Sequence, residues 1–508
     1  MTHRKTIVLI YPQQGFSGNY VRHMPLSLLY AASEVVKSGW DVRILDTRVH
    51  ENWQQRLADI LAQGGTLCVG ISVMSGRPIG HATEIGRYAK SLAPDVPVIW
   101  GGPHATFYPE SILDEWSCDY VVSGYASESF DSLVQVTADN GTPDQIPGIS
   151  WREGGVAKRN PAIETQFESI DYRDIPYHLI DDYSVYGQLE SDQRIFSMYS
   201  ALGCPYKCSF CSSPAQYASI KGKKWVPLQP KDVVDHIQYV VEKYNANFIY
   251  FIDDDSFPKL SHVESIIDEI TRRNLPVKLG FRGARINELK RMSHAFLDKL
   301  AAAGTDILHI GAECGSNRIL ELIRKDCTVD DIVEVNRKLA RHPQITAAYN
   351  FIMGVPSETL GELRQTAGLM LQLVNDHPNC IIFPPNKFRP LPGTELYDIA
   401  AKQWDYRMPE TLAEWADIEV EANAKAGWYE PGVERMFNLM LITSYFIDNK
   451  IPRLTSGRTW FFKLARLVNT LYRPVALLRL RRGWSALLIE YVLYRWATRL
   501  MTKGEKAG

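Results

Sequence analysis

A chain of 508 residues is long enough for two or three domains, and a net charge of −2 gives no overall attraction to nucleic acid. Its 45% hydrophobic and 22% charged residues indicate a globular protein, and its eight cysteines favour a reducing compartment over a disulfide framework. No charge-free stretch approaches the roughly 20 residues of a membrane-spanning helix, and the apolar run over 7–11 is too short for a signal peptide. We therefore expect a cytoplasmic protein.

The first 140 residues alternate between strand and helix patterns. Buried-strand runs cover 6–11, 41–45, 67–73, 96–100 and 120–122, and helical spacing covers 26–37, 54–62 and 82–93. This alternation predicts an α/β domain over 1–140 with a doubly wound, Rossmann-like parallel sheet. Ligands of such sheets bind at the carboxyl ends of the strands.

Glycine-rich turns follow three of these strands: Ser72-Val-Met-Ser-Gly76, Gly101-Gly102-Pro103-His104 and Ser123-Gly124. The spacing of the first two turns, and the stretch 101–130, resemble the cobalamin-binding Rossmann domain. The resemblance implies that cobalamin contacts Ser72, Met74, Gly76, Gly101, Gly102, His104 and Gly124.

The chain departs from that family in two places. The family's Asp-x-His-x-x-Gly element, whose histidine binds cobalt, has no match; the nearest candidate is His23, which lacks both the Asp and the Gly and is expected to be an ordinary loop histidine. The family's Gly-Glu-Gly-Glu turn is replaced by Gly124-Tyr-Ala-Ser-Glu128. Cobalamin would then bind without a histidine below the metal. The alternative is a Rossmann domain that binds another ligand or none.

Residues 141–194 are expected to form a linker. Prolines punctuate the segment, and the runs 149–151 and 156–158 flank Glu153-Gly-Gly155 as a small hairpin would. Strand and helix patterns then resume over 195–400. The expected strands are 195–200, 248–252, 277–280, 307–312, 347–352 and 381–383.

Three cysteines lie within eight residues just after the first of these strands, in Cys204-Pro-Tyr-Lys-Cys208-Ser-Phe-Cys211. Cysteines this close rarely reach disulfide geometry with one another, but their thiolates can ligate three irons of a cubane cluster and leave the fourth open. Structural zinc normally takes four ligands, and the other cysteines are scattered singly. Zinc and a chance grouping of cysteines are the alternatives.

The C-x3-C-x2-C spacing, with Phe210 before the last cysteine, resembles the signature of radical S-adenosylmethionine (SAM) enzymes. The resemblance implies a [4Fe–4S] cluster on Cys204, Cys208 and Cys211 whose open iron chelates SAM, and reductive cleavage of SAM to a 5′-deoxyadenosyl radical. It also implies a partial (β/α)6 barrel over 195–400, and an external electron donor such as flavodoxin or ferredoxin.

Polar residues lie at the expected carboxyl ends of the barrel strands, where barrel enzymes place their chemistry. Gly311-Ala-Glu313-Cys-Gly-Ser316 resembles the family's G-x-E-x-G-S turn, whose carboxylate helps to hold SAM. Asp255 has two interpretations, a helix or turn cap and a SAM contact. The residues predicted to bind SAM are Phe210, Asp253, Asp254, Arg285, Glu313 and Asn350; no catalytic residue is assigned.

The last segment, 401–508, is expected to be helical. From Arg453 onward it holds twelve Lys or Arg against Glu490 and Glu505, interleaved with Trp and Leu. This pattern is typical of helices that lie in a membrane interface, which would place the protein on the inner face of the membrane. A helical cap on the barrel is the second interpretation, and RNA binding is the third.

Together these features predict a cobalamin-dependent radical SAM enzyme. We expect a C-methyltransferase that acts on an unactivated carbon of a hydrophobic small molecule, such as an isoprenoid lipid or a tetrapyrrole. The alternative reactions are rearrangement, ring contraction or oxidative cyclisation with the same cofactors. A non-catalytic iron–sulfur binding module is the alternative from another class.

Overall fold

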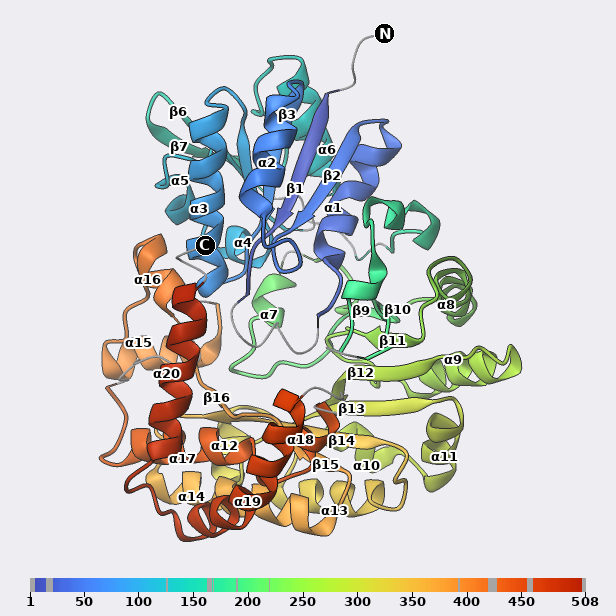
Figure 1. The fold of residues 1–508 in the computed structure, drawn as a ribbon, viewed down its shortest axis with the longest axis vertical. Helices are drawn as coiled ribbons and strands as arrows, with labels where there is room; N and C mark the ends of the chain where they lie inside the picture. The colour runs from blue at the N-terminus through green and yellow to red at the C-terminus, as the bar shows by residue number, and fades with distance from the viewer. Residues whose placement is uncertain are drawn as a thin grey trace. The chain divides into compact units, whose positions relative to one another are not determined.

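The computed structural model (Figure 1) describes residues 5–14, 22–124, 127–161, 167, 169–188, 191–218, 220–391, 393–418, 427–454 and 460–504. The chain forms two compact units. The N-terminal unit comprises Met1–Val185, Ser219–Lys221 and Met408–Ala422, and the barrel unit comprises Tyr186–Ala218, Gly222–Arg407 and Asn423–Gly508.

The N-terminal unit is built on one sheet with the strand order β2-β1-β3-β4-β5-β6-β7. The strands are β1 (Thr6–Tyr11), β2 (Asp41–Asp46), β3 (Thr66–Ser72), β4 (Val98–Gly101), β5 (Tyr120–Val122), β6 (Ile149–Glu153) and β7 (Val156–Arg159). β1 to β5 pair in parallel, and β6 and β7 are antiparallel. The predicted doubly wound sheet is confirmed, with the order 2-1-3-4-5 of one of the two common doubly wound topologies.

Helices cover both faces of this sheet, because alternate residues of each strand point to opposite sides. Ile7 and Leu9 of β1 pack with α1 and α6, whereas Val8 and Ile10 pack with α2 and α3. The helices of the unit are α1 (Leu26–Lys37), α2 (Trp53–Ala62), α3 (Arg77–Leu92), α4 (Pro103–Phe107), α5 (Pro109–Leu113), α6 (Ser127–Ala138) and α16 (Leu412–Asp417), with helical turns at Tyr172–Asp174, Tyr177–Leu179 and Tyr183–Val185.

Two segments differ from the sequence-based expectation. The hairpin expected within a linker forms as β6 and β7, but β6 pairs with β5 and completes the N-terminal sheet. The three-residue β5 would otherwise be an exposed edge with unpaired backbone groups. α16, expected in the helical C-terminal region, belongs to the N-terminal unit, where Trp415 packs into the core beneath α3. The domain limits at 140, 194 and 400 stay predictions.

The barrel unit contains six parallel strands in the order β15-β14-β13-β12-β11-β8. They are β8 (Ile195–Met198), β11 (Phe248–Phe251), β12 (Lys278–Arg285), β13 (Thr305–Glu313), β14 (Thr346–Met353) and β15 (Cys380–Ile382); the short β16 (Asn386–Lys387) pairs with β14, and β9 (Ala201–Gly203) pairs with β10 (Trp225–Pro227). The predicted partial barrel is confirmed, and each expected strand lies within a few residues of its observed limits.

Helices such as α8, α9, α11, α13 and α14 line the outside of the curved sheet (Figure 1). The helices of the unit are α7 (Ser213–Gln216), α8 (Pro230–Tyr244), α9 (Leu260–Arg272), α10 (Ile286–Arg291), α11 (His294–Ala302), α12 (Asn317–Leu322), α13 (Val329–Leu339), α14 (Leu360–Asp376), α15 (Glu395–Trp404), α17 (Val433–Ser444), α18 (Lys450–Leu454), α19 (Trp460–Arg482) and α20 (Ile489–Gly504). Among the described residues, no helix combines the length and the low charge needed to cross a membrane.

Candidate active site and cofactor sites

The three-cysteine loop joins β9 to α7 at the carboxyl end of the barrel sheet, and its backbone is tied to two other elements. Ser209 donates its N–H to the carbonyl oxygen of Ile323 at 3.2 Å and its hydroxyl to that of Leu322 at 2.8 Å. Leu396 at the start of α15 donates its N–H to the carbonyl oxygen of Ser209 at 3.1 Å. These bonds fix the loop without using a cysteine side chain.

Cys204, Cys208 and Cys211 are free thiols, each partly buried. Burial raises the pKa of Cys204 to about 12 and also raises the pKa of Cys211, so these thiols keep their protons until a metal displaces them. Each thiolate of a cubane cluster binds a different iron, so cluster ligands need not converge on one point. Among the described residues no three His, Cys, Asp or Glu side chains converge as the ligands of a single ion do.

Arg285, the last residue of β12, contacts this loop directly. Its guanidinium donates to Sγ of Cys208 at 2.9 Å and to the carbonyl oxygen of Lys325 at 2.7 Å, and it lies over the ring of Tyr206 at 3.9 Å. The backbone N–H of Ser213 donates to Sγ of Cys211 at 3.4 Å. Donors of this kind stabilise thiolate and tune the potential of iron–sulfur clusters, so the donor set fits a cluster held by three cysteines.

A buried pair of carboxyl groups lies under the loop. Tyr206 donates its hydroxyl to Oε1 of Glu288 at 2.6 Å, and Glu288 is hydrogen-bonded to Asp255. Burial, and then the neighbouring Glu288, raise the pKa of Asp255 well above its usual range, which favours the protonated form of Asp255. Phe257 donates its N–H to Oδ1 of Asp255 at 3.2 Å. This bond is the one that the interpretation of Asp255 as a turn cap requires.

Asp253 and Asp254 follow β11 but have different surroundings. Asp253 is buried, and its carboxylate accepts from the N–H groups of Ser200 and Ala201 at 2.7 and 3.2 Å and from the Ser200 hydroxyl. Burial raises the pKa of Asp253 to about 6. The exposed Asp254 accepts from the hydroxyl of Tyr217. Asp253 therefore joins β11 to the end of β8, and the SAM contacts of both residues stay predictions.

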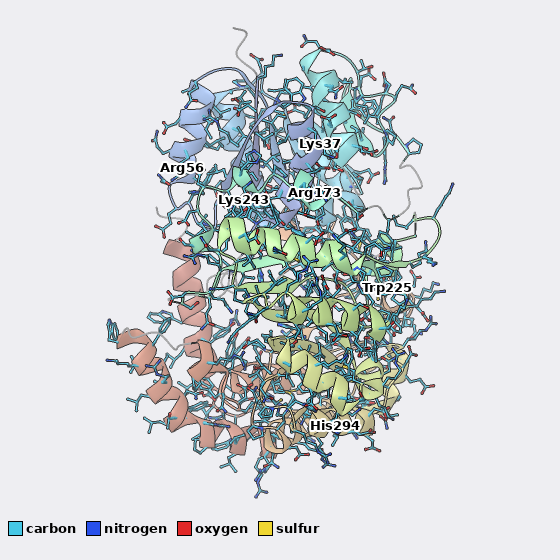
Figure 2. The ribbon with its side chains drawn as sticks, turned by 90° about the vertical axis from the view of Figure 1, so that its right-hand side faces the viewer. Lys37, Arg56, Arg173, Trp225, Lys243 and His294 are labelled. Carbon is cyan, nitrogen blue, oxygen red and sulfur yellow. The ribbon has the colours of Figure 1, made fainter. Side chains whose placement is uncertain are left out.

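A glycine on β12 allows this aspartate turn to approach the neighbouring strand. A Cβ atom at Gly283 would lie 2.7 Å from the carbonyl oxygen of Asp254 and 2.7 Å from the Cα of Asp255, both of them backbone atoms. Trp225 of β10, labelled in Figure 2, supports the same turn by donating Nε1 to the carbonyl oxygen of Asp255 at 3.1 Å. The turn is thus held from both sides.

Glu313 ends β13 in a left-handed conformation with φ 64°, next to a shift in the register between β13 and β14. Its Oε1 accepts from Nζ of Lys325 at 2.6 Å, and both side chains are buried. Burial alone would lower the pKa of Lys325, but the Glu313 carboxylate outweighs it and raises that pKa. A Cβ atom at Gly311 would lie 2.5 Å from Nζ of Lys325, so this glycine makes room for the ion pair.

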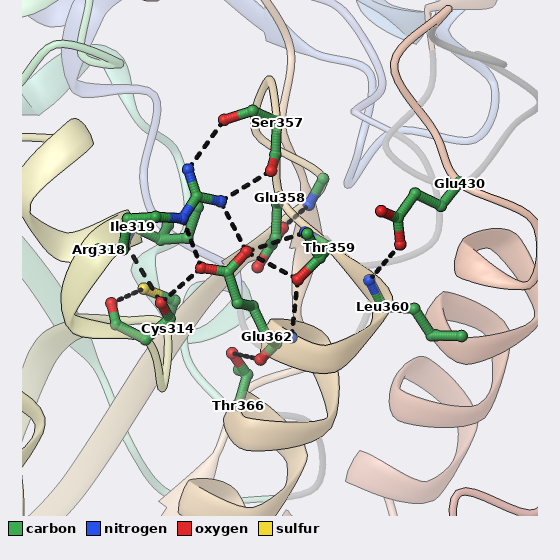
Figure 3. A network of polar contacts seen from close by, with 12 residues as sticks. Cys314, Arg318, Ile319, Ser357, Glu358, Thr359, Leu360, Glu362, Thr366 and Glu430 are labelled. Carbon is green, nitrogen blue, oxygen red and sulfur yellow. Dashed lines mark hydrogen bonds and ion pairs between the residues drawn. The ribbon is translucent and has the colours of Figure 1, made fainter.

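The turn after Glu313 is anchored to the start of α14, as Figure 3 shows. Glu362 accepts from the hydroxyl of Ser316 at 2.8 Å and from two nitrogens of Arg318 at 2.8 and 2.6 Å. The same carboxylate caps α14 through the N–H of Thr359 at 3.0 Å. The Arg318 guanidinium and these donors outweigh burial and lower the pKa of Glu362 to about 2. Glu362 thus remains charged and holds the Glu313 turn.

The other two residues predicted to bind SAM lie on the strand next to β13 and inside the cysteine loop. Asn350 is half-buried on β14, in register with Gly311. Phe210 is half-buried inside the cysteine loop. The structure thus joins the loop to Arg285, and Arg285 to the segment that carries Lys325 and hence Glu313. The individual SAM contacts stay predictions.

Sequence analysis missed three members of this network: Tyr206, Glu288 and Lys325. Tyr206 lies within the cysteine motif, so its position was a usable signal. Glu288 and Lys325 lie on α10 and after α12, and no motif marks them; only the fold brings them to the cysteine loop.

In the N-terminal unit the three glycine-rich turns follow β3, β4 and β5, which are neighbours in the sheet. Backbone bonds join the first two: Val73 donates to the carbonyl oxygen of Gly101 at 2.8 Å, and His104 donates to that of Val73 at 3.1 Å. Gly124 donates its N–H to the Thr106 hydroxyl at 3.0 Å, which connects the third. These hydrogen bonds therefore connect the three segments predicted to bind cobalamin into one surface of mostly small residues.

Gly102 adopts φ 97° and ψ −173°, which is accessible essentially to glycine alone. A Cβ atom there would lie 2.9 Å from both the nitrogen and the carbonyl oxygen of Val73. Gly76 has a similar conformation at the start of α3. Ser72 shares a hydrogen bond with Ser27 at 3.2 Å, and Met74 is exposed. A surface of this kind suits a ligand that approaches the backbone closely.

His104 differs from the other predicted cobalamin-binding residues, because its side chain is fully buried. It shares a hydrogen bond with the Ser75 hydroxyl at 2.9 Å and packs against Tyr108 and Trp415. Burial lowers the pKa of His104 to about 4, so it is neutral. The structure gives it a packing role, and its contact with cobalamin stays a prediction. The carbonyl oxygen of His23 accepts from Arg48 at 2.9 Å.

Comparison with known proteins gives the same two domains. The profile of the Radical SAM superfamily matches residues 198–370, and that of the B12 binding domain matches residues 20–134. An uncharacterized methyltransferase of Pyrococcus horikoshii is 29% identical over 74% of this chain and 78% of its own. An anaerobic magnesium-protoporphyrin IX monomethyl ester cyclase of Cereibacter sphaeroides is 26% identical over 76% of this chain and 63% of its own. A hopanoid C-3 methylase of Methylococcus capsulatus is 25% identical over 77% and 72%.

The fold is also that of a solved structure. The radical S-adenosylmethionine methyltransferase TsrM of Kitasatospora setae, with cobalamin and a [4Fe-4S] cluster bound, superposes with a TM-score of 0.67 at 18% identity, over 94% of this chain and 99% of that one. The fold and the two matched domains define an enzyme that uses radical SAM chemistry together with cobalamin. Residues 198–370 are a radical SAM domain, and residues 20–134 are a B12 binding domain.

The cofactors of this enzyme are a [4Fe–4S] cluster, SAM and cobalamin. The cysteine loop and the glycine turns each suit one of these cofactors. Three thiols on one pinned loop, with an arginine and a backbone N–H donating to their sulfurs, suit the cluster. A connected surface of small residues with a glycine-only conformation at Gly102 suits a large ligand that lies against backbone.

Proposed function

We propose that this enzyme is a C-methyltransferase that transfers a methyl group to an unactivated carbon of a hydrophobic small molecule. The observation that carries the proposal is the connection of the cysteine loop, through Arg285, to the segment that holds the buried Lys325–Glu313 pair. An electron-transfer module needs the cluster alone, whereas a second charged site joined to the cluster loop suits a bound cosubstrate.

The cysteines, Arg285 and the Glu313–Lys325 pair have different roles in the proposed reaction. Cys204, Cys208 and Cys211 hold the cluster, which supplies one-electron chemistry when bound, while the cobalamin domain supplies a methyl carrier. Arg285 keeps the charge of the Cys208 thiolate balanced. Glu313 accepts from a hydroxyl or ammonium group of SAM, and its ion pair with Lys325 positions its carboxylate for this contact.

The relatives support methyl transfer more than other outcomes. The Pyrococcus and Methylococcus proteins are named a methyltransferase and a methylase, and TsrM is a methyltransferase. The hydrophobic substrate class is supported by two names, a hopanoid methylase and a protoporphyrin ester cyclase, and by the apolar C-terminal helices. We propose an isoprenoid lipid or a tetrapyrrole as substrate, reached by a protein that lies on the cytoplasmic face of the membrane. An external flavodoxin or ferredoxin would supply electrons.

A second candidate is oxidative cyclisation or rearrangement with the same cofactors. The observation in its favour is the cyclase of Cereibacter sphaeroides, whose identity of 26% differs little from the 29% of the Pyrococcus methyltransferase. A non-catalytic iron–sulfur module is the candidate from another class.

The test uses anaerobically reconstituted protein with hydroxocobalamin, a chemical reductant and SAM that carries a deuterated methyl group. Lipid extract and a set of tetrapyrroles are the two substrate pools, and products are analysed by mass spectrometry. Methyl transfer predicts S-adenosylhomocysteine, 5′-deoxyadenosine and a deuterated product. 5′-Deoxyadenosine with an unlabelled, dehydrogenated product would instead establish the second candidate. If protein that holds its cluster releases no nucleoside with either substrate pool, the non-catalytic iron–sulfur module is the remaining candidate function.

A further inference from the structure

The last two helices present a large apolar surface to solvent. Of the eighteen exposed large hydrophobic side chains among the described residues, thirteen lie on α19, α20 and the turn between them. We call these the α19–α20 surface: Trp460, Leu464, Leu467, Val468, Leu471, Val475, Leu478, Trp484, Leu487, Ile489, Val492, Leu493 and Trp496. Soluble monomers rarely expose contiguous apolar patches of this kind, which mark interaction sites.

The members on α19 form one stripe, because they recur at intervals of three and four residues over five helical turns. The opposite side of α19 faces the protein, and α19 packs there against α14 and α17. That inner side buries Phe462, Ala476 and Leu480 in the core, each at most 2% exposed, whereas Leu471 on the outer stripe is 69% exposed. An ordinary surface helix is polar on its outer side, so the outer apolar stripe is not explained by packing within this chain.

Cations border the stripe. Residues 460–504 hold nine Lys or Arg and the single acid Glu490, whose carboxylate is paired with Arg479 at 3.3 Å. Lys463 and Arg481 are exposed and eighteen residues apart, which is five full turns, so they flank the stripe on the same side. Arg482 is exposed at its C-terminal end. The surface is therefore apolar in the middle and positive at its border.

We propose that the α19–α20 surface lies in the headgroup region of a membrane leaflet that contains anionic lipids, with α19 parallel to the membrane plane. Leucines and valines would enter the acyl boundary, and the cations would meet lipid phosphates. The three tryptophans of this surface, Trp460, Trp484 and Trp496, are exposed, and tryptophan is a side chain enriched at membrane interfaces.

The charge distinguishes this occupant from a second copy of the chain. In a symmetric dimer formed through the stripe, the same patch meets itself, so Lys463, Arg481 and Arg482 would meet cations of the other copy. Anionic lipid neutralises them instead. The proposal of membrane binding does not depend on the proposed reaction, because binding to vesicles is measured without substrate. A protein that binds lipid but transfers no methyl group would refute only the proposed reaction.

The test measures sedimentation of the full-length holoprotein with vesicles of phosphatidylcholine, with and without phosphatidylglycerol. We expect partitioning into anionic vesicles, and we expect Leu467→Asp/Leu471→Asp to reduce the partition coefficient about 100-fold, since two side chains that enter the acyl boundary become charged. Leu92→Asp/Val156→Asp, which alters two exposed apolar residues of the N-terminal unit, is the matched control and should partition like the wild type. Circular dichroism and the cluster absorbance verify that each variant is folded.

A second variant, Lys463→Gln/Arg481→Gln/Arg482→Gln, keeps the stripe and removes exposed charge. We expect a loss of about 100-fold on anionic vesicles at low salt, because each cation near an anionic surface contributes about fivefold, and little loss on neutral ones. Wild-type protein that fails to partition, or stripe and charge variants that partition like it, would overturn the proposal. So would a wild-type dimer in analytical ultracentrifugation that the stripe variant dissociates without any vesicle binding, which would assign the surface to a second copy.

Discussion

The two units have their candidate cofactor sites at the same position, the carboxyl ends of parallel strands, but form them from different kinds of residue. In the N-terminal unit the strand ends are turns of glycine and small residues, joined by backbone hydrogen bonds such as that from Val73 to Gly101. In the barrel unit they carry charged side chains with buried partners, such as Glu313 with Lys325.

The difference shows two ways of preparing a surface for a cofactor. A glycine turn removes side chains so that a ligand can lie against backbone, and it depends on contacts within a few residues or between adjacent strands. A buried ion pair costs desolvation free energy and is stable only if each charge has its partner. Removing a partner should therefore affect the barrel unit more than adding a methyl group affects the N-terminal unit.

The largest effect is expected for Cys208→Ala. Without this thiolate one iron loses its protein ligand, so the brown absorbance, the bound iron and the release of 5′-deoxyadenosine should all be lost. Iron analysis and product analysis after anaerobic reconstitution measure this. Cys118→Ala, at a buried cysteine of the N-terminal unit, should retain all three. A Cys208 variant that kept its iron and its nucleoside release would remove the cluster from this loop.

Lys325→Met should lower the free energy of unfolding by about 3–5 kcal/mol at pH 8, because it leaves Glu313 charged and buried without a partner. Denaturant unfolding measures the change, and the double variant Glu313→Gln/Lys325→Met should recover most of it. Lys290→Met is the matched control: its pair with Asp331 is at the surface and should be worth at most about 1 kcal/mol. Equal losses in the two single variants would contradict the special role of the buried pair.

Ionisation of Glu358 should make the stability of the protein depend on pH. This residue is buried near the start of α14, and burial raises its pKa to about 7. The folded state then binds more protons than the unfolded state between about pH 4.5 and pH 7, so stability falls as pH rises through that window. Glu358→Gln should match the wild type near pH 4.5 and exceed its stability by about 3 kcal/mol at pH 8. Urea unfolding at the two pH values measures the difference; a constant offset between wild type and variant would argue against the raised pKa.

The smallest effect is expected in the N-terminal unit. Gly102→Ala places a methyl group against the backbone of Val73 in a conformation that disfavours any side chain, and should cost about 2 kcal/mol. Gly124→Ala is the matched control: φ is also positive, at 84°, but no atom lies within 4 Å of the added Cβ. Both variants share the backbone strain of a positive φ, so the difference between their free energies of unfolding in urea measures the effect of crowding alone. Cobalamin binding, measured by absorbance, should fall for both variants, because each adds a methyl group to the surface predicted to contact the cofactor.

Much of the fold follows from local pattern. The parallel strands of both units were predicted from short apolar runs, because a strand buried on both faces reads as a nearly continuous apolar segment. The cysteine loop and the glycine turns were predicted because their residues are adjacent in the chain. The hairpin β6–β7 was predicted as a structure but placed in a linker, since nothing local shows that β5 needs a partner.

What the amino-acid sequence determined by itself is the set of elements, the cysteine loop and the glycine turns, all of which depend on residues within one turn or strand. Only the tertiary structure decided that Lys325 pairs with Glu313, that Glu288 accepts from Tyr206, that α16 joins the N-terminal unit and that the apolar side of α19 faces outward. The reason is physical. Pairing and burial depend on contacts between segments distant in the chain, and a side chain's type does not say which segment will cover it.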